Sequence, residues 1–450
     1  MRITRRTLLL GAGAGVASVL LVSCTPEPAP TPTPTRTRTP EPPPGVPAPA
    51  DSIRSTWTKD PFALGAVSFT PVGVLSDTRS ALARPVDKRL FFAGEATDPD
   101  APGTLRGAIS SGERAAEEVL VPATSGERIA VVGAGLAGAT VASLLVERGM
   151  QVTVFEARDR VGGRVDSRVD DSWPVPVQLG AWLFGEEDAD LLDRLNSGQI
   201  GIADLTGDLW RTPDGDIDPV DPAPFDAALA TAQAAPMDSS VADALAAANI
   251  DPADPATAAL LAILAARTGA GADELSSWFA PPLPTSDPKA ARDSLTPFVE
   301  QALEGVQVGL NSPVARIAYD DSGVSVRLGT GEALSFDRVV VTAPLGVLQD
   351  RGIEFDPPLP FSNRGAIAAL GMGAIETIWL RWDEPFWDNE EAIWHAVGAD
   401  AAIPTWINLR PVTGENVLVG IVGAAAAVEF ADLDEDAALD AALASLALYL

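Results

Sequence analysis

A glycine-rich turn between two apolar segments is the feature that most constrains this chain. Arg128–Val132 is a β-branched run, and the hexapeptide GAGLAG at 133–138 follows it directly. A helical stretch then continues to Arg148, and residues 150–155 have the pattern of a second strand that ends at Glu156. A GxGxxG turn between strand and helix, followed by an acid after the next strand, is typical of Rossmann-like α/β domains.

Each element of this motif has a physical role in holding a dinucleotide. Gly133 allows the tight turn, Gly135 lets the backbone approach a pyrophosphate, and Gly138 lets the helix pack closely on the strand. The helix N-terminus presents free N–H groups and the positive end of its dipole to the phosphates. Glu156 is predicted to hydrogen-bond the ribose hydroxyls.

The acidic composition narrows the choice of partners. The formal net charge of −31 argues against nucleic acid and against anionic lipid surfaces. Such a charge would favour cationic substrates, although a uniformly acidic, soluble surface explains it equally.

Cysteine and histidine are each present once. Cys24 is the only cysteine, which excludes an internal disulfide and a cysteine-based metal site, and we predict no metal centre. His395 is the only histidine, so a Ser-His or Cys-His mechanism has one candidate base. It lies in EAIWHAVG, which we expect to form a strand, and we interpret this histidine as structural.

Residues 1–24 are predicted to be a Tat-type lipoprotein signal. Twin arginines precede an apolar run, and Leu21-Val22-Ser23-Cys24 resembles a bacterial lipobox. The alternative is an ordinary signal peptide with an incidental cysteine. Residues 25–50 are rich in Pro and Thr and are expected to form an extended tether. We therefore expect Tat export and attachment to the outer face of the bacterial cell membrane, only through a lipid on Cys24.

The residues after Glu156 resemble a known family. The run EARDRVGGR at 156–164 is similar to the signature of flavin amine oxidases, which include monoamine, polyamine and L-amino acid oxidases. The run QLGAW at 178–182 is similar to that family's "LGAxW" strand. The resemblance implies FAD, which we expect to be non-covalent because a lipidated Cys24 leaves no thiol for a cysteinyl–flavin bond. It implies contacts with the cofactor from Arg158, Gly163, Arg164, Gly180 and Ala181.

Further family motifs lie before the dinucleotide motif. FFAGE at 91–95 resembles a strand end that implies roles for Gly94 and Glu95 at the ribityl chain or pyrophosphate. The stretch 102–108 resembles the start of a helix that points the N–H groups of Thr104 and Leu105 at the flavin ring.

Two more segments extend the resemblance along the chain. WTKDPFALGA at 57–66 makes Trp57 a candidate wall of the active site, or else a core tryptophan. NSPV at 311–314 implies that the backbone of Val314 meets the adenine.

The order of these motifs is unusual for the family. Segments that end its members come first here, at 51–120, and the dinucleotide motif follows. The chain therefore resembles a circular permutation, with a cut between Leu450 and Asp51. The new join is the short segment 121–126.

Some positions depart from the family on the substrate side. Thr377 occupies the position of the usual lysine near the flavin, and Val67 occupies the position of a common tyrosine. Thr104 aligns with one member of the monoamine oxidase aromatic pair, as in polyamine oxidases. Arg106 stands where the family motif has a histidine. These changes indicate either an altered substrate or lost catalysis.

The resemblance implies an α/β fold: a Rossmann-like FAD-binding domain of the glutathione-reductase type with a mixed-sheet substrate domain and a helical insertion. The expected segments are 51–120 (permuted end of the FAD domain), 126–185 (its Rossmann start), 186–299 (substrate and helical domain), 300–350 (return to the FAD domain) and 351–450 (remainder of the substrate domain).

Three functions remain open at this stage. The first is an FAD-dependent oxidase that oxidises the C–N bond of a small amine by hydride transfer to flavin, with O2 or another acceptor taking the electrons and O2 giving H2O2. The second is a flavin-binding protein with altered or lost oxidase activity. The third is an L-amino acid oxidase, for which Arg106 is the candidate cation for the carboxylate.

The motifs make a direct prediction about the cofactor. Gly135→Glu should abolish FAD binding, because its side chain would bring bulk and negative charge to the pyrophosphate position. Deletion of residues 91–116 should do the same. The measurement is the flavin absorbance of the purified protein, and normal FAD binding by the deletion variant would contradict the permuted site.

Overall fold

The computed structural model describes residues 45–399 and 401–450. The predicted signal, Cys24 and most of the predicted tether lie outside these residues. No helix in the described part is both long and apolar enough to cross a membrane.

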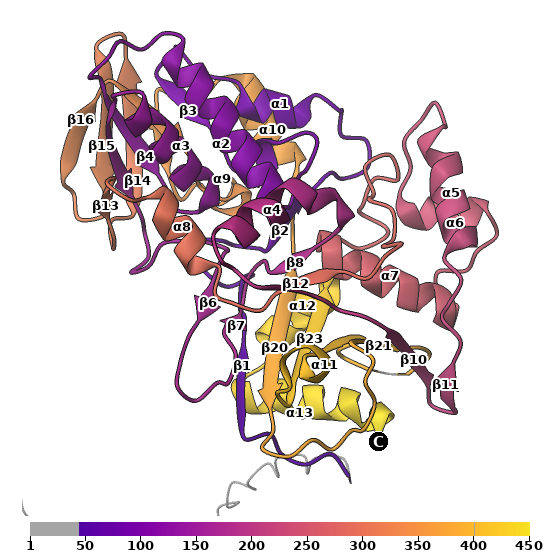
Figure 1. The fold of residues 1–450 in the computed structure, drawn as a ribbon. Coiled ribbons are helices and arrows are strands. Elements are labelled where there is room, and N and C mark those ends of the chain that lie inside the picture. The colour runs from indigo at the N-terminus through magenta and orange to yellow at the C-terminus, as the bar shows by residue number, and fades with distance from the viewer. Residues whose placement is uncertain (1–44, 400) are drawn as a thin grey trace, which may run out of the picture. The chain divides into compact units, whose positions relative to one another are not determined.

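A five-stranded parallel sheet forms the upper left of the molecule in Figure 1. Its order is β13 (Gln307–Gly309), β5 (Gln151–Phe155), β4 (Arg128–Val132), β17 (Arg338–Val341) and β3 (Leu90–Phe92). All four pairings are parallel. Strand β3 precedes the glycine turn in the sequence and completes the same sheet beside β17.

Both faces of this sheet are buried, as the apolar strands require. Ile129 and Val131 of β4 face one apolar cluster, and Ala130 and Val132 face another. Helices α2 (Leu105–Leu120) and α3 (Leu136–Glu147) contribute buried side chains to the cluster that contains Ile129 and Val131. The second contains a four-stranded sheet of order β16-β15-β14-β18, with bounds Ala333–Phe336, Gly323–Leu328, Val314–Asp320 and Glu354–Asp356. This layered arrangement confirms the predicted Rossmann-like α/β fold.

A seven-stranded mixed sheet forms the lower part of the molecule (Figure 1). Its order is β1 (Asp51–Arg54), β20 (Ile375–Arg381), β23 (Val417–Gly423), β22 (Thr405–Asn408), β21 (Ile393–Ala396), β10 (Asp208–Thr212) and β11 (Gly215–Ile217). Only the β10–β21 pair is parallel. One face packs in an apolar cluster with α12 (Ala424–Asp432) and α13 (Glu435–Leu446).

The C-terminal helical region is interrupted between α12 and α13. It is two helices, because the chain turns extended at Leu433 and the Asp434 side chain caps α13 by accepting from the Ala437 N–H. This bond satisfies one of the free N–H groups at the start of α13.

The helical insertion consists of α5 (Ala223–Gln233), α6 (Val241–Ala247) and α7 (Pro255–Thr268). Helix α7 begins where the Asp254 side chain accepts from two backbone N–H groups, and it ends at Gly269, whose φ is +67°. It packs against β20 and β23 and thereby joins the insertion to the mixed sheet.

The remaining elements connect these layers. They are α1 (Thr78–Ala83), β2 (Val67–Phe69), η1 (Glu95–Thr97), β6 (Ser167–Arg168), β7 (Val177–Gln178), β8 (Leu183–Phe184), η2 (Glu186–Asp188), α4 (Ala189–Ser197), β9 (Ile202–Asp204), β12 (Lys289–Ala291), α8 (Thr296–Ala302), α9 (Leu345–Gln349), α10 (Phe361–Ala369), β19 (Gly371–Gly373), α11 (Arg410–Thr413) and η3 (Ala447–Tyr449).

The last residues of the predicted tether pack on the folded body. Val46 is buried in the same apolar cluster as Tyr449, and the Trp382 indole donates to the carbonyl of Pro47 at 3.0 Å. A Cβ on Gly45 would lie 2.6 Å from Leu450 Cδ1. The two ends of the described chain are therefore neighbours.

Candidate active site

A single cavity of about 1160 Å³ joins the dinucleotide motif to the mixed sheet. Gly133 and Gly135 line one part of it, and Thr377 and His395 line another. Cavities for drug-sized ligands range from roughly 300 to 1000 Å³. The volume therefore suits a large cofactor together with a second molecule.

The glycine turn forms the dinucleotide end of the cavity. Gly133 has φ +105°, and a Cβ on Gly138 would lie 2.0 Å from the Gly133 carbonyl oxygen. Gly135 is on the cavity wall, and outside its own helix and chain neighbours the nearest atom to a Cβ there would be the Gly162 carbonyl oxygen, 3.7 Å away. A side chain at 135 would therefore enter the space that a pyrophosphate needs, so the turn fits a dinucleotide.

Glu156 is held at the end of β5 by backbone groups. Its Oε2 accepts from the Ala134 N–H at 2.7 Å and its Oε1 from the Arg158 N–H at 2.9 Å. The residue lines the cavity with 4 % of its surface exposed. A carboxylate has about four acceptor positions, so this group retains capacity for ribose hydroxyls.

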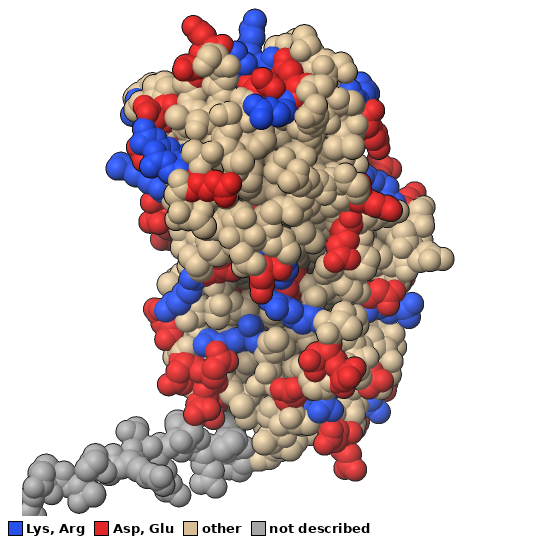
Figure 2. Space-filling model, turned by 90° about the vertical axis from the view of Figure 1, so that its left-hand side faces the viewer, with Lys and Arg blue, Asp and Glu red and all other residues tan. Residues whose placement is uncertain are grey.

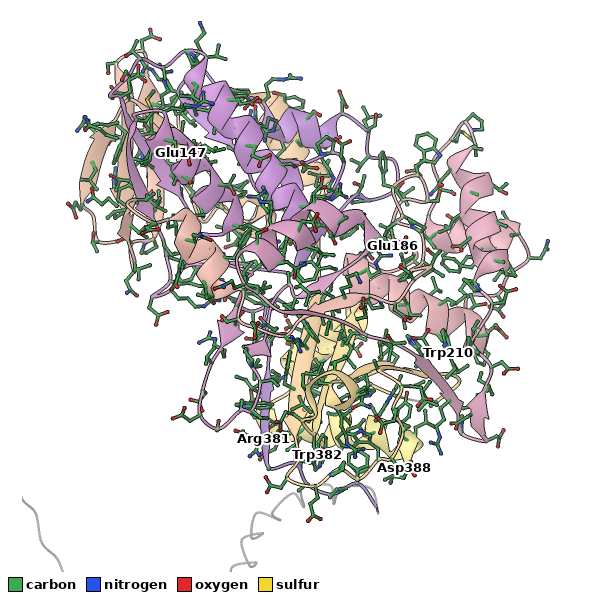
Figure 3. All side chains as sticks on the ribbon, viewed as in Figure 1. Glu147, Glu186, Trp210, Arg381, Trp382 and Asp388 are labelled. Atoms are coloured by element: carbon green, nitrogen blue, oxygen red, sulfur yellow. The ribbon has the colours of Figure 1, made fainter. Side chains whose placement is uncertain are left out.

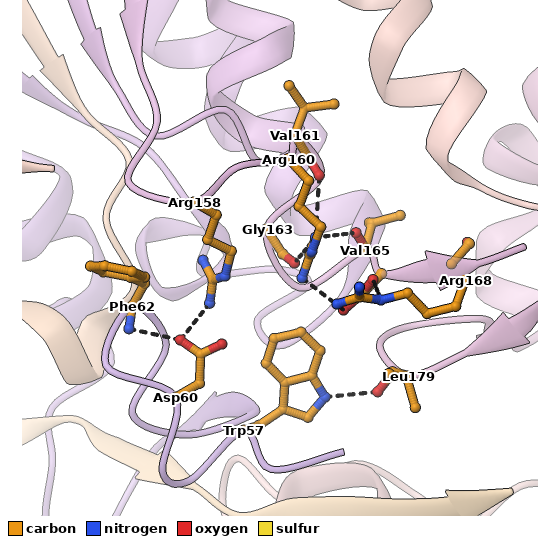
Figure 4. Close-up of polar contacts among 12 residues, drawn as sticks. Trp57, Asp60, Phe62, Arg158, Arg160, Val161, Gly163, Val165, Arg168 and Leu179 are labelled. Atoms are coloured by element: carbon orange, nitrogen blue, oxygen red, sulfur yellow. Dashed lines mark hydrogen bonds and ion pairs between the residues drawn. The ribbon is translucent and has the colours of Figure 1, made fainter. Parts of the chain in front are cut away.

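Arg158 is positioned by residues from the front of the chain (Figure 4). Its Nη2 lies 2.7 Å from Asp60 Oδ1, and its guanidinium lies 5.6 Å from the centroid of the Phe62 ring. Asp60 also accepts from the Phe62 N–H. This cluster fixes a cation on the cavity wall, where the anionic part of FAD would lie.

The loop after Arg158 is held by Arg160, a role that the sequence reasoning missed. Its guanidinium donates to the carbonyls of Val161, Gly163 and Val165 and pairs with Asp166 at 2.8 Å (Figure 4). Only the geometry of the loop reveals this role, because the arginine bonds mainly to backbone atoms.

Glu95 is the centre of a buried polar cluster. Its carboxylate accepts from Arg164 Nη1 at 2.8 Å, the Ser68 hydroxyl at 2.6 Å and the Gly103 N–H at 2.8 Å. Burial by itself raises the pKa of Glu95, but Arg164, the Ser68 hydroxyl and Arg79 together hold that pKa below its ordinary value. The carboxylate therefore stays charged and fixes Arg164.

Helix α2 directs its N-terminus at the cavity. The Thr104 hydroxyl accepts from the Gly107 N–H at 2.9 Å and donates to the Ala101 carbonyl at 2.8 Å. Thr104 and Leu105 line the cavity. The positive end of the dipole of this 16-residue helix thus faces the place where a flavin ring would carry negative charge.

Arg106 does not lie where the amino acid oxidase hypothesis requires it. Its Nε lies 3.8 Å from Asp188 Oδ1, and its side chain is 40 % exposed. It is not among the described residues that line the cavity. The geometry therefore gives no support to a contact of Arg106 with a substrate carboxylate, because the side chain turns toward Asp188.

Two tryptophans hold the LGAW segment in place. The Trp57 indole donates to the Leu179 carbonyl at 2.7 Å, and the Trp379 indole donates to the Gln178 carbonyl at 3.2 Å. A Cβ on Gly180 would lie 1.8 Å from the Arg164 carbonyl, so only glycine fits. Trp57 is buried and also lines the cavity, so it belongs to both the core and the wall.

The other positions implied by the resemblance also meet at this cavity. The cavity wall includes Gly94, Gly163, Ala181 and Val314.

The mixed sheet supplies the opposite wall through Thr377. The Thr377 N–H donates to the Ser55 hydroxyl at 2.8 Å, and its own hydroxyl is buried without a hydrogen-bond partner among the described residues. Val67 pairs with Gly373, just before the same strand, and also lines the cavity. Together they form the wall where a substrate would meet the cofactor.

His395 is buried, as its structural interpretation requires, and it also lies on the cavity wall. It stacks against Trp210, with ring centroids 4.3 Å apart. Burial lowers its pKa to about 4. A neutral imidazole is therefore available to a ligand at physiological pH.

The substrate part of the cavity is acidic. Its wall includes one arginine, Arg267, and five acids: Glu186, Glu187, Asp188, Asp208 and Asp287. Burial raises the pKa of Asp208, and Asp287 raises it further. Acidic side chains are otherwise scattered over the surface rather than gathered in one patch on the face in Figure 2. The excess of acidic over basic side chains on this part of the wall favours a cationic substrate.

Comparison with known proteins places the chain among flavoenzymes. The family described as "Flavin containing amine oxidoreductase" matches residues 40–120 and 224–450. The description "NAD(P)-binding Rossmann-like domain" matches residues 131–195.

Individual proteins are similar over most of the chain. Polyamine oxidase 4 of Oryza sativa subsp. japonica is 29% identical over 356 residues, which cover 71% of this chain and 72% of that protein. Polyamine oxidase 2 of Arabidopsis thaliana is 26% identical, with 72% of each chain covered. A structure of putrescine oxidase bound to putrescine has a TM-score of 0.59 at 20% identity, over 73% of this chain and 82% of that one. The structural likeness shows a shared fold.

The buried histidine generates a pH prediction. Because the unfolded chain protonates His395 near 6.5 and the folded chain only near 4, its burial should reduce stability as the pH falls from 6.5 to 4, by up to about 3 kcal/mol. His395→Phe keeps an aromatic ring against Trp210 and removes this proton. Urea unfolding should show the variant losing less stability than the natural protein over that range. Parallel pH profiles would contradict the prediction.

Proposed function

The chain belongs to the flavin-containing amine oxidoreductase family, and from this premise we propose that it oxidises a linear aliphatic amine held between FAD and the mixed sheet. The observation that carries the proposal is the single cavity, lined by the glycine turn in one part and Thr377 in another. FAD, when bound, accepts a hydride from the carbon next to the amine nitrogen and passes the electrons to O2, giving H2O2, or to another acceptor.

The residues around this cavity would bind and orient the two molecules. Glu156 and the helix N-termini hold the dinucleotide, while the Glu95–Arg164 pair and Arg158 supply fixed charges. Trp57 and Trp182 form an apolar wall that limits water around the reacting carbon.

Thr377 determines how the amine loses its proton. Its hydroxyl is free to hold a water or the amine itself, but a threonine does not act as a base at neutral pH. The proton would therefore leave to water or to another base on the cavity wall. This step is expected to make turnover increase with pH over the range in which the free amine forms.

The charges on the wall favour amines over amino acids. Five acids and one arginine line the substrate part, and Arg106 approaches one of these acids, Asp188, without lining the cavity itself. The similar proteins named polyamine oxidases and putrescine oxidase also support a linear amine. A substrate carboxylate would meet repulsion there.

A second function follows from the same position. Thr377 and Val67 replace the lysine and tyrosine of the resemblance, so a flavoprotein with altered or lost oxidase activity is the alternative. Both functions predict bound FAD, and reduction by an amine separates them.

We also propose that the chain is a circular permutation of its family. The family match is divided between residues 40–120 and 224–450, with the Rossmann-like match at 131–195 between them. Strand β3 and helix α2 precede the glycine turn and complete its sheet layer, and Gly45 lies beside Leu450. Loss of FAD binding on deletion of residues 91–116 is the test of this arrangement.

The main function is tested by anaerobic flavin reduction. A linear amine or diamine added to the full-length, FAD-loaded protein should bleach the flavin absorbance, and air should restore it. Amino acids of similar size should do so at least tenfold more slowly, since the wall is acidic. Thr377→Lys should increase the rate if the missing base limits turnover. A flavin that no amine reduces would instead support the altered flavoprotein.

Export and lipid anchoring are proposed from the sequence alone. The twin arginines and the LVSC run at 21–24 support Tat export and lipidation of Cys24. Cys24→Ala should move the protein from the membrane fraction to the soluble fraction of a bacterial cell. Replacement of Arg5 and Arg6 by lysine should retain it in the cytoplasm. Membrane association of the Cys24 variant at the natural level would reject the anchor.

A further inference from the structure

One row of side chains crosses the mixed sheet on its cavity face. Strand registers place Thr377 opposite Ile421, Ile421 opposite Thr405, Thr405 opposite His395, and His395 beside Trp210. All five residues line the cavity. Figure 3 shows Trp210 on β10, at the side of the sheet away from β20.

The polar atoms of this row are buried and free to bind. Thr377, Thr405 and Trp210 are 7 %, 8 % and 5 % exposed, and the two hydroxyls and the indole N–H have no hydrogen-bond partner among the described residues. Buried polar atoms are nearly always paired in folded proteins. Three such atoms in one row on a cavity wall indicate a ligand that supplies the missing partners.

The row carries no charge. Threonine and tryptophan are neutral, and His395 is deprotonated at neutral pH because burial holds its pKa at about 4. The neighbouring row on the same face contains Ile407 and Ile393 and ends at Asp208. On this face the register therefore places the Asp208 carboxylate two residues along β10 from Trp210, a rise of about 7 Å.

Strand spacing gives the row a length scale. Adjacent strands lie about 4.8 Å apart, so Thr405 is about 10 Å from Thr377 and His395 about 14 Å from it. Thr377 marks the cofactor end, because its N–H donates to the Ser55 hydroxyl, two residues before Trp57, and the Trp57 indole donates to the Leu179 carbonyl of the LGAW segment.

We propose that Thr405, His395 and Trp210, which lie about 10, 14 and 19 Å along the row from Thr377, form a subsite for an uncharged hydrogen-bonding group, an amide or a hydroxyl, at the distal end of the amine substrate. The Trp210 N–H and the Thr405 hydroxyl are each free to donate to such a group. The imidazole of His395 offers one donor and one acceptor. This inference rests on the proposed function, because it assigns the distal part of the same substrate.

The test compares three amines of equal length. The probes are an n-alkylamine, the corresponding α,ω-diamine, and a diamine acetylated at one nitrogen, each in a series of increasing chain length. With the natural protein, the acetylated diamine should have the lowest KM at one chain length, about tenfold or more below that of the alkylamine.

Matched variants identify the residues responsible. Thr405→Val has nearly the shape of threonine without the hydroxyl, and it should raise KM for the acetylated diamine about tenfold while leaving the alkylamine unchanged. Thr405→Ser keeps the hydroxyl and should restore the lower KM. His395→Phe keeps the ring and should act like Thr405→Val.

Two results would overturn the subsite. One is equal KM values for the acetylated diamine and the alkylamine at every chain length. The other is a preference for the free diamine that disappears in Asp208→Asn, which would assign the distal group to a cation.

Failure of the proposed function is recognised separately. If no amine reduces the flavin, binding is measured by the shift of the oxidised flavin spectrum and by the rise in Tm on adding each amine. If the natural protein then binds the acetylated diamine more tightly than the alkylamine, and Thr405→Val loses this preference, the subsite is supported without oxidase activity. If neither the flavin spectrum nor the Tm shows this preference, the subsite is rejected.

Discussion

The buried carboxylate of Glu95 is the interaction on which the cofactor end depends. It joins Ser68, Gly103 and Arg164, which come from three segments separated by up to 96 residues of sequence. Removing one partner of a buried ion pair leaves an uncompensated charge, which costs about 3 to 5 kcal/mol. Glu95 therefore fixes three segments relative to one another: the start of α2, the strand that carries Val67, and the loop after the glycine turn.

The two ends of the cavity use different chemistry. The cofactor end consists largely of backbone, with Gly133, Gly135, Gly180 and the N-termini of two helices. The substrate end consists of side chains on a sheet, such as Thr377 and His395. Side chains on a sheet face can change without moving the backbone, so the fold retains its cofactor end while the substrate end varies.

The sequence predicted the local part of this structure and missed the long-range part. The strand–turn–helix at 128–156 depends on neighbouring residues, so its pattern sufficed. The row from Thr377 to Trp210 depends on the registers of five strands drawn from residues 208–212 and 375–423, which no local pattern specifies. For the same reason the sequence alone could not place His395 on the cavity wall or Arg106 beside Asp188.

The order of strands in the parallel sheet determines when the protein can fold during synthesis. Strand β17 lies between β4 and β3, yet it is made about 200 residues after β4 and 250 after β3. Until residue 341 leaves the ribosome, the apolar strands LFF and RIAVV expose unpaired edges to other chains. The parallel sheet at the cofactor end therefore cannot be completed until about three quarters of the chain has been made.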